Sequence, residues 1–195
     1  MNSVLSISAA VFLAASLFNS AFAQSSIVVN GGFEEGMVTD ISGPHPVGWN
    51  PGFGFLMAAL PGAAEGSYAA HPFELAYQDL STAPATYYQL QFAVAAISNA
   101  VSVTVLWDTT EIGTFLTLPA PDHVGYLPLF PEWFEKDIIV FSDATTTRLT
   151  FQSQTPFLLD AVQVTAVPEP ATFSLFLILL LGFVLGRSGT RRIES

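Results

Sequence analysis

Cysteine is absent from this chain of 195 residues, and bases are scarce, with five Lys or Arg against 16 Asp or Glu. The absence of cysteine excludes disulfides, thiol catalysis and zinc–thiolate sites. Three of the bases are Arg187, Arg191 and Arg192, so residues 24–167 hold 14 acids and two bases, a net charge of −12. This charge repels phosphate backbones, which argues against nucleic-acid binding, and it suits recruitment of divalent cations.

Recognisable catalytic motifs are missing as well. The three histidines, His45, His71 and His123, stand beside prolines or in a proline-rich stretch, and none accompanies a nucleophile elbow. No His-Glu-x-x-His pattern occurs. Gly31-Gly32 is followed by no predicted helix, so it does not form a phosphate loop. The sequence therefore predicts a protein that is not an enzyme.

The N-terminus is apolar from residue 4 to 22 and ends in Ala21-Phe22-Ala23, a small-x-small pattern that signal peptidase accepts. It carries no Lys or Arg, a departure from the usual pattern. The alternative is a buried first helix. We predict a signal peptide over residues 1–23 and export of the rest.

The C-terminal segment combines three features in order: Pro168-Glu169-Pro170, an apolar stretch at 173–185, and a basic tail at 187–192. A helix over 171–186 would span roughly 24 Å, short of a hydrocarbon core of about 30 Å but tolerable with thinning of the bilayer. The arginines would stay cytoplasmic, which leaves the acidic part outside.

Residues 167–192 resemble the PEP-CTERM sorting signal of Gram-negative bacteria that make exopolysaccharide. The resemblance implies recognition by an exosortase, which cuts near Pro168, Glu169 and Pro170 and releases or transfers the protein. It also implies an inner-membrane precursor and a mature protein at the cell surface or in the extracellular matrix. The alternative is a plain single-pass anchor.

Between the two signals the pattern is β throughout. Residues 88–94 and 101–107 alternate apolar with polar or small residues, which predicts that Tyr88, Leu90, Phe92, Val94, Val101, Val103, Val105 and Trp107 face inward. Further strands are predicted at 27–29, 53–59, 68–70, 74–80, 113–118, 136–141, 146–152 and 157–165. Residues 119–132 hold four prolines and are predicted to form an irregular loop, a candidate rim for a binding face. We predict an all-β, antiparallel jelly-roll sandwich over residues 24–166.

The domain begins with Asn30-Gly-Gly-Phe-Glu34 and ends with Asp160-Ala-Val162. This pair, with the segments 76–80, 86–92 and 147–151 between, resembles galactose-binding-like jelly rolls, which include several carbohydrate-binding modules. The resemblance implies a structural calcium ion held by Glu34 and Asp160, with Glu35 or Asp40 assisting. The alternative is that Asn30 and Glu34 cap a turn while Asp160 accepts hydrogen bonds from backbone amides.

The same resemblance implies binding of polysaccharide, in this setting exopolysaccharide. Exposed aromatic side chains would stack on the sugar, and the candidates are Trp49, Tyr68, Tyr77, Tyr87, Tyr126 and Trp133. Core packing is the competing role for each of them. The alternative function is a structural or adhesive matrix protein without a small ligand.

Overall fold

The computed structural model describes residues 25–40, 43–51, 55–119, 123–124, 127–128 and 130–168. Ser25–Val167 forms one compact unit. The predicted signal peptide (1–23), apolar segment (173–185) and basic tail (187–192) lie outside the described residues, as do Glu169 and Pro170. Within the described part of the chain, no helix is long and apolar enough to cross a membrane.

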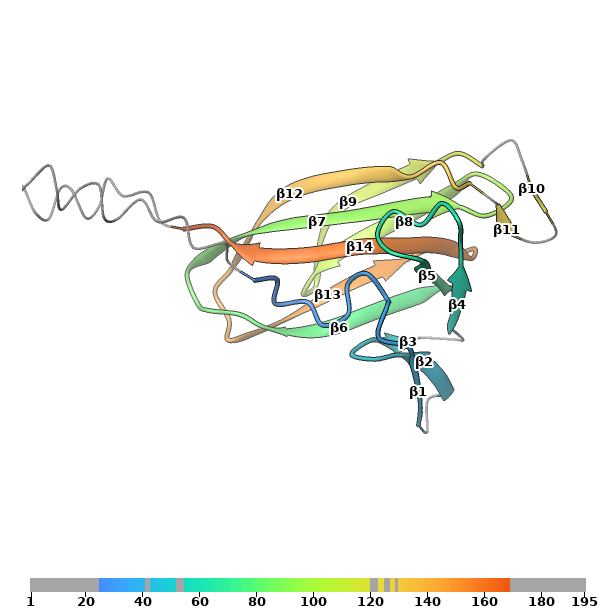
Figure 1. Cartoon of the computed structure of the whole chain (residues 1–195). Coiled ribbons are helices and arrows are strands. Elements are labelled where there is room, and N and C mark those ends of the chain that lie inside the picture. Colours follow the sequence, from blue (N-terminus) through green and yellow to red (C-terminus); the bar gives the residue numbers. More distant parts are fainter. Residues whose placement is uncertain are drawn as a thin grey trace, which may run out of the picture. The chain divides into compact units, whose positions relative to one another are not determined.

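Two five-stranded antiparallel sheets form the body of the unit (Figure 1). The first sheet has the order β12 (Phe134–Ser142), β7 (Thr86–Ala96), β14 (Phe157–Ala166), β5 (Tyr68–Pro72) and β4 (Phe55–Ala59). The second has the order β3 (Asn50–Pro51), β6 (Leu75–Ser81), β13 (Thr146–Gln152), β8 (Val101–Trp107) and β9 (Thr110–Thr117). The predicted all-β sandwich is confirmed, and the described residues contain no helix.

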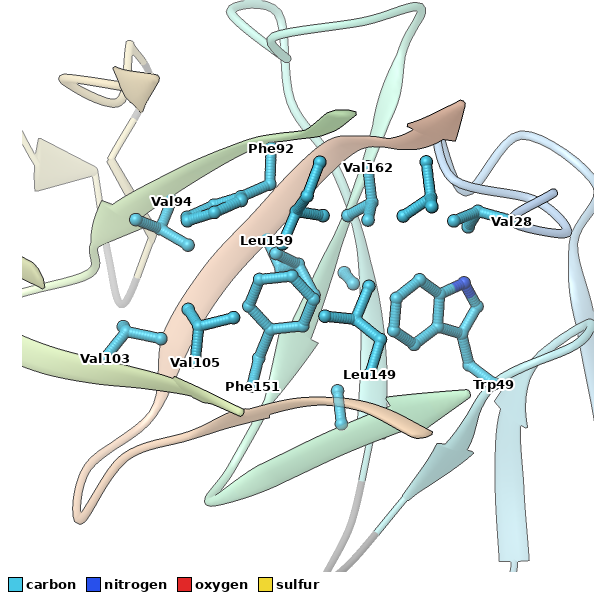
Figure 2. Packing of buried hydrophobic residues seen from close by; sticks show 14 of the residues in the cluster. Val28, Trp49, Phe92, Val94, Val103, Val105, Leu149, Phe151, Leu159 and Val162 are labelled. Atoms are coloured by element: carbon cyan, nitrogen blue, oxygen red, sulfur yellow. The ribbon is translucent and has the colours of Figure 1, made fainter. Parts of the chain in front are cut away.

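The core lies between these two sheets. All eight side chains predicted to face inward from β7 and β8 are buried. In Figure 2, Leu149 and Phe151 of β13 meet Leu159 of β14, and the indole of Trp49 lies beside Leu149. Each such side chain stabilises the fold by about 1.5–3 kcal/mol when it leaves water. The alternation seen in the sequence is therefore the alternation between core and surface.

The N-terminal turn replaces the strand predicted at residues 27–29, and that prediction is wrong. Ile27 donates a hydrogen bond to the Val164 carbonyl, and the Gly31 carbonyl accepts one from the Val162 amide, but the residues between them form bends instead of a strand. A Cβ on Gly31 would lie 1.9 Å from the carbonyl oxygen of Val162, so only glycine permits this approach. The turn brings the fully buried Phe33 into the core.

Two short hairpins were not predicted. β1 (Met37–Asp40) pairs with β2 (Gly43–Pro46), and β10 (His123–Val124) pairs with β11 (Leu127–Pro128) inside the stretch predicted to be irregular. Both contain proline, which removes a backbone donor. Two-stranded pairs tolerate this loss because each strand has a free edge.

Candidate functional site

On β7, the odd-numbered residues point away from the core and lie on the outer face of the first sheet. β12 and β14 flank β7, and their registers place Asp137 and Gln163 opposite Gln91, one on each side. Residues opposite one another in a sheet share a face. Gln91 is therefore the centre of a polar row across three strands.

One half of this face is covered by the loop between β4 and β5, residues 60–67, which curls over β14 in Figure 1. Leu60 of the loop packs with Leu158 of the sheet in a second, smaller hydrophobic cluster. Trp133 packs on the same cluster, and its Nε1 donates a hydrogen bond of 2.6 Å to the Gly62 carbonyl. The covered half cannot meet a ligand.

Two carboxylates hold this loop. Asp160 Oδ2 accepts a hydrogen bond from the amide of Glu65 at 3.0 Å, and Oδ1 accepts one from the amide of Ala161 at 2.7 Å. Glu34 Oε1 accepts from the amides of Ser67 and Tyr68, both at 2.7 Å. Burial raises the pKa of Asp160 to about 6, although its backbone hydrogen bonds favour the charged form.

These hydrogen bonds match the alternative to calcium that the sequence left open. Asn30 also acts as a turn cap, because its Oδ1 accepts from the Glu35 amide at 3.1 Å. Among the described residues, no three Asp, Glu, His or Cys side chains gather closely enough to hold a metal ion. Calcium takes six to eight oxygen ligands, so an ion beside Glu34 and Asp160 would depend mainly on backbone carbonyls.

A pocket of about 500 Å³ lies on the open half of the face, against the loop. Ala64 of the loop lines one side, and the small side chains of Ala93 and Ala161 also border it. Its polar and charged lining comes from three neighbouring strands: Gln91, Glu135, Lys136, Asp137 and Gln163. We name this the β7 pocket.

One carboxylate oxygen holds two glutamines of β7, Gln91 at the pocket and Gln89 two residues before it on the same face. The Nε2 atoms of Gln89 and Gln91 donate hydrogen bonds of 2.8 and 3.0 Å to Asp137 Oδ2. All three side chains are at the surface and share a face through the register of β7 and β12. The outcome is an ordered row of amides and carboxylates, the groups that hydrogen-bond sugar hydroxyls.

An apolar end adjoins this polar row. Tyr87 lies opposite Phe141, with ring centroids 5.1 Å apart, and their side chains are 57% and 48% exposed. Ile139, which is 56% exposed, lies opposite Gln89 on the same face. Tyr87 precedes Gln91 by four residues, or about 13 Å along the strand. Exposed aromatic rings beside polar groups suit a ligand that is apolar on one face and hydroxylated at its edge.

The other aromatic candidates have different surroundings. Trp49 is fully buried, and Trp133 packs beneath the loop. Tyr77 lies under the guanidinium of Arg148, whose Cζ is 4.2 Å from the ring centroid. Tyr68 is exposed on β5, and Tyr126 is outside the described residues. Among the candidates that the structure describes, Tyr87 shares the outer face of β7 with the β7 pocket, although it does not line the pocket.

The outer face of the second sheet carries a larger pocket, of about 870 Å³, lined by Ser102, Thr104 and Gln152 among others. Its neighbour Tyr77 is stacked by Arg148, which Asp79 holds through hydrogen bonds of 2.6 and 2.8 Å. This pocket offers hydroxyls, two amides and the Glu74 carboxylate, but its lining includes no aromatic side chain, and the ring of Tyr77 is occupied by Arg148. We therefore place the candidate site at the β7 pocket.

Sequence reasoning did not name Gln89, Gln91, Glu135, Asp137 or Gln163. The signal was present, since both glutamines alternate with buried residues along β7. That alternation identifies outward positions on any strand. It does not tell which part of the face a distant loop will cover.

No protein-family model and no curated protein matches the chain. Among solved structures, the CBM22-1 xylan-binding domain of Paenibacillus barcinonensis Xyn10C is similar, with a TM-score of 0.51 and 14% identity over 77% of this chain and 100% of that one. TmCBM61, in complex with β-1,4-galactotriose, has a TM-score of 0.50 and 16% identity over 74% and 99%. A cyclase from Fischerella sp. TAU gives a TM-score of 0.49 and 16% identity over 75% and 98%. The two carbohydrate-binding modules show the fold of this chain, an all-β sandwich of their jelly-roll type.

Proposed function

We propose that this protein is an exported, non-catalytic module that binds polysaccharide through the outer face of β12, β7 and β14. The observation that carries the proposal is that the β7 pocket, an ordered row of amides and carboxylates and an exposed aromatic pair lie on one open sheet face. Two modules with this fold, one described as xylan-binding and one bound to galactotriose, support it.

Binding to a glycan array tests the proposal, with the full-length protein in detergent solution and an array that includes β-1,4-linked xylose, galactose and glucosamine oligomers. We expect saturable binding that Gln91→Ala or Tyr87→Ala weakens about tenfold, because each change removes one direct ligand contact worth on the order of 1–2 kcal/mol. Tyr77→Ala, on the other sheet, is the matched control. Absence of saturable binding would favour the alternative, a structural or adhesive matrix protein without a small ligand.

For sorting, we propose that an exosortase at the inner membrane processes the chain near Pro168, Glu169 and Pro170 and that the mature protein reaches the cell surface or matrix. Pro168 is exposed just after β14, which suits access by a protease. Intact mass in an exopolysaccharide-producing host, with and without its exosortase, tests this. Full-length protein in the inner membrane under both conditions would instead support a plain anchor.

A structural calcium ion beside Glu34 and Asp160 is a further part of the proposal. It rests on the resemblance to carbohydrate-binding jelly rolls and on two carboxylates that contact the same loop. Native mass spectrometry is expected to show one calcium ion, and EDTA is expected to lower the melting temperature. A metal-free mass with unchanged melting would leave the hydrogen bonds to the loop as the only role of these residues.

A further inference from the structure

The balance of hydrogen-bond donors and acceptors at the β7 pocket indicates which class of polysaccharide it binds. Gln89 and Gln91 both direct their Nε2 donors to Asp137 Oδ2. An amide whose nitrogen is engaged in this way presents its carbonyl oxygen to a ligand. Among the described residues neither Oε1 accepts a hydrogen bond, so both are available as acceptors. Each amide therefore offers its carbonyl oxygen as an acceptor and keeps only its second N–H as a donor.

Carboxylates add to the same polarity. Asp137 keeps Oδ1 as an acceptor, and Glu135 lies two residues away on the same face of β12, opposite Ala93. In the described part of the chain, Glu135 has no hydrogen bond or ion pair. The pocket and the adjoining Gln89 thus present at least five acceptor oxygens, and two carboxylate groups line the pocket.

The ammonium of Lys136, the nearest basic group, does not neutralise the two carboxylates at the pocket. Lys136 borders the pocket, but its Nζ lies 4.3 Å from the ring centroid of Phe134 and 5.7 Å from that of Phe115. Phe134 and Phe115 pack against the core, and as an even-numbered residue of β12 Lys136 points to that side. Cation–π contacts of this kind hold the ammonium over the rings and away from Glu135 and Asp137.

We propose that the β7 pocket selects polysaccharides whose sugars carry free ammonium groups over neutral ones, and that it rejects those carrying uronate groups. This inference rests on the proposed polysaccharide binding. An ammonium brings three donors and a positive charge to a surface on which acceptor oxygens and carboxylates predominate. A hydroxyl brings one donor, and a uronate brings acceptors and a like charge. The 14 acids of residues 24–167 repel anionic chains at longer range as well.

Calorimetric titration of the full-length protein in detergent tests the inference with three probes: an oligomer of β-1,4-linked glucosamine, the same oligomer N-acetylated, and an oligogalacturonate. The titrations are run at a pH below the pKa of the glucosamine amino groups, so that these groups are protonated. We expect the free-amine oligomer to bind about tenfold more tightly than the acetylated one, as a charge-assisted hydrogen bond implies, and galacturonate to bind least. Raising the salt concentration should weaken only the free-amine complex.

Glu135→Gln keeps the shape of the side chain and removes its charge. We expect it to reduce the preference for the free amine to about threefold or less while binding of the acetylated oligomer changes little. Glu111→Gln, on β9 of the other sheet, makes the same change in net charge and should keep the full preference. Equal binding of the two glucosamine oligomers, or tighter binding of galacturonate, would overturn the selectivity but leave polysaccharide binding standing. No binding of any probe would overturn both.

Discussion

Replacing Trp49 by alanine is expected to lower the free energy of unfolding by about 3–5 kcal/mol, the usual cost of deleting a large buried aromatic side chain. Trp49 is fully buried, and its ring centroid lies 5.3 Å from that of Phe33 and 6.2 Å from that of Phe151. Its Nε1 donates a hydrogen bond of 3.1 Å to the Asn30 carbonyl. The substitution leaves a cavity and removes one of the two hydrogen bonds that the Asn30 carbonyl accepts, the other coming from the Phe33 amide at 3.2 Å.

Tyr87→Ala is the matched control, because it also deletes an aromatic side chain but one that is 57% exposed. We expect it to change stability by less than about 1 kcal/mol while weakening ligand binding. Urea unfolding followed by circular dichroism measures both variants. Similar losses of stability for the two would contradict the assignment of Trp49 to the core and Tyr87 to the ligand face.

Asp160 is expected to make the fold less stable as pH rises from about 4 to about 6. Its pKa is raised by burial from 3.8 to about 6, so the folded state binds the proton more tightly than the unfolded chain. The stabilisation that the protonated Asp160 contributes is complete below the unfolded-state pKa of 3.8. It is lost as pH rises through the folded-state pKa of about 6. Two pKa units correspond to up to about 3 kcal/mol.

Asp160→Asn keeps the side chain neutral at every pH, so the difference in unfolding free energy between wild type and this variant isolates the group. As pH rises from 4 to 7, we expect the wild type to lose up to about 3 kcal/mol of unfolding free energy relative to the variant. Unfolding in urea with EDTA present measures it on the metal-free protein. Asp143→Asn, at an exposed position, should show no such shift. A constant difference for Asp160→Asn would mean that the carboxyl is not desolvated.

The sequence predicted the central strands well because their side chains alternate without interruption. The bounds of β8 and β13 match the predicted 101–107 and 146–152 to the residue. Such strands bury one face each, and a period of two identifies it. The β1–β2 hairpin was not predicted, and its Pro44 and Pro46 are residues that strands rarely contain, although a two-stranded pair tolerates them.

The site was harder to predict because it depends on contacts between distant residues. Trp49 was a candidate ligand contact, and nothing in its neighbourhood along the chain shows that it packs on Phe151, about a hundred residues later. Likewise, Gln91 is open and Ala95 is covered only because the loop at 60–67 reaches one part of the face. Tyr87 was among the candidates, but the sequence offered no means to choose between them.

The position of a bound sugar chain tests the central claim most directly. Amide chemical shifts of the full-length protein in detergent, recorded during titration with the β-1,4-linked glucosamine oligomer, would locate it. The account predicts that shifts concentrate on the outer face around Gln91, from Tyr87 and Phe141 to Gln163. Shifts confined to the pocket of the second sheet around Thr104 and Gln152, or an absence of saturable shifts, would contradict it.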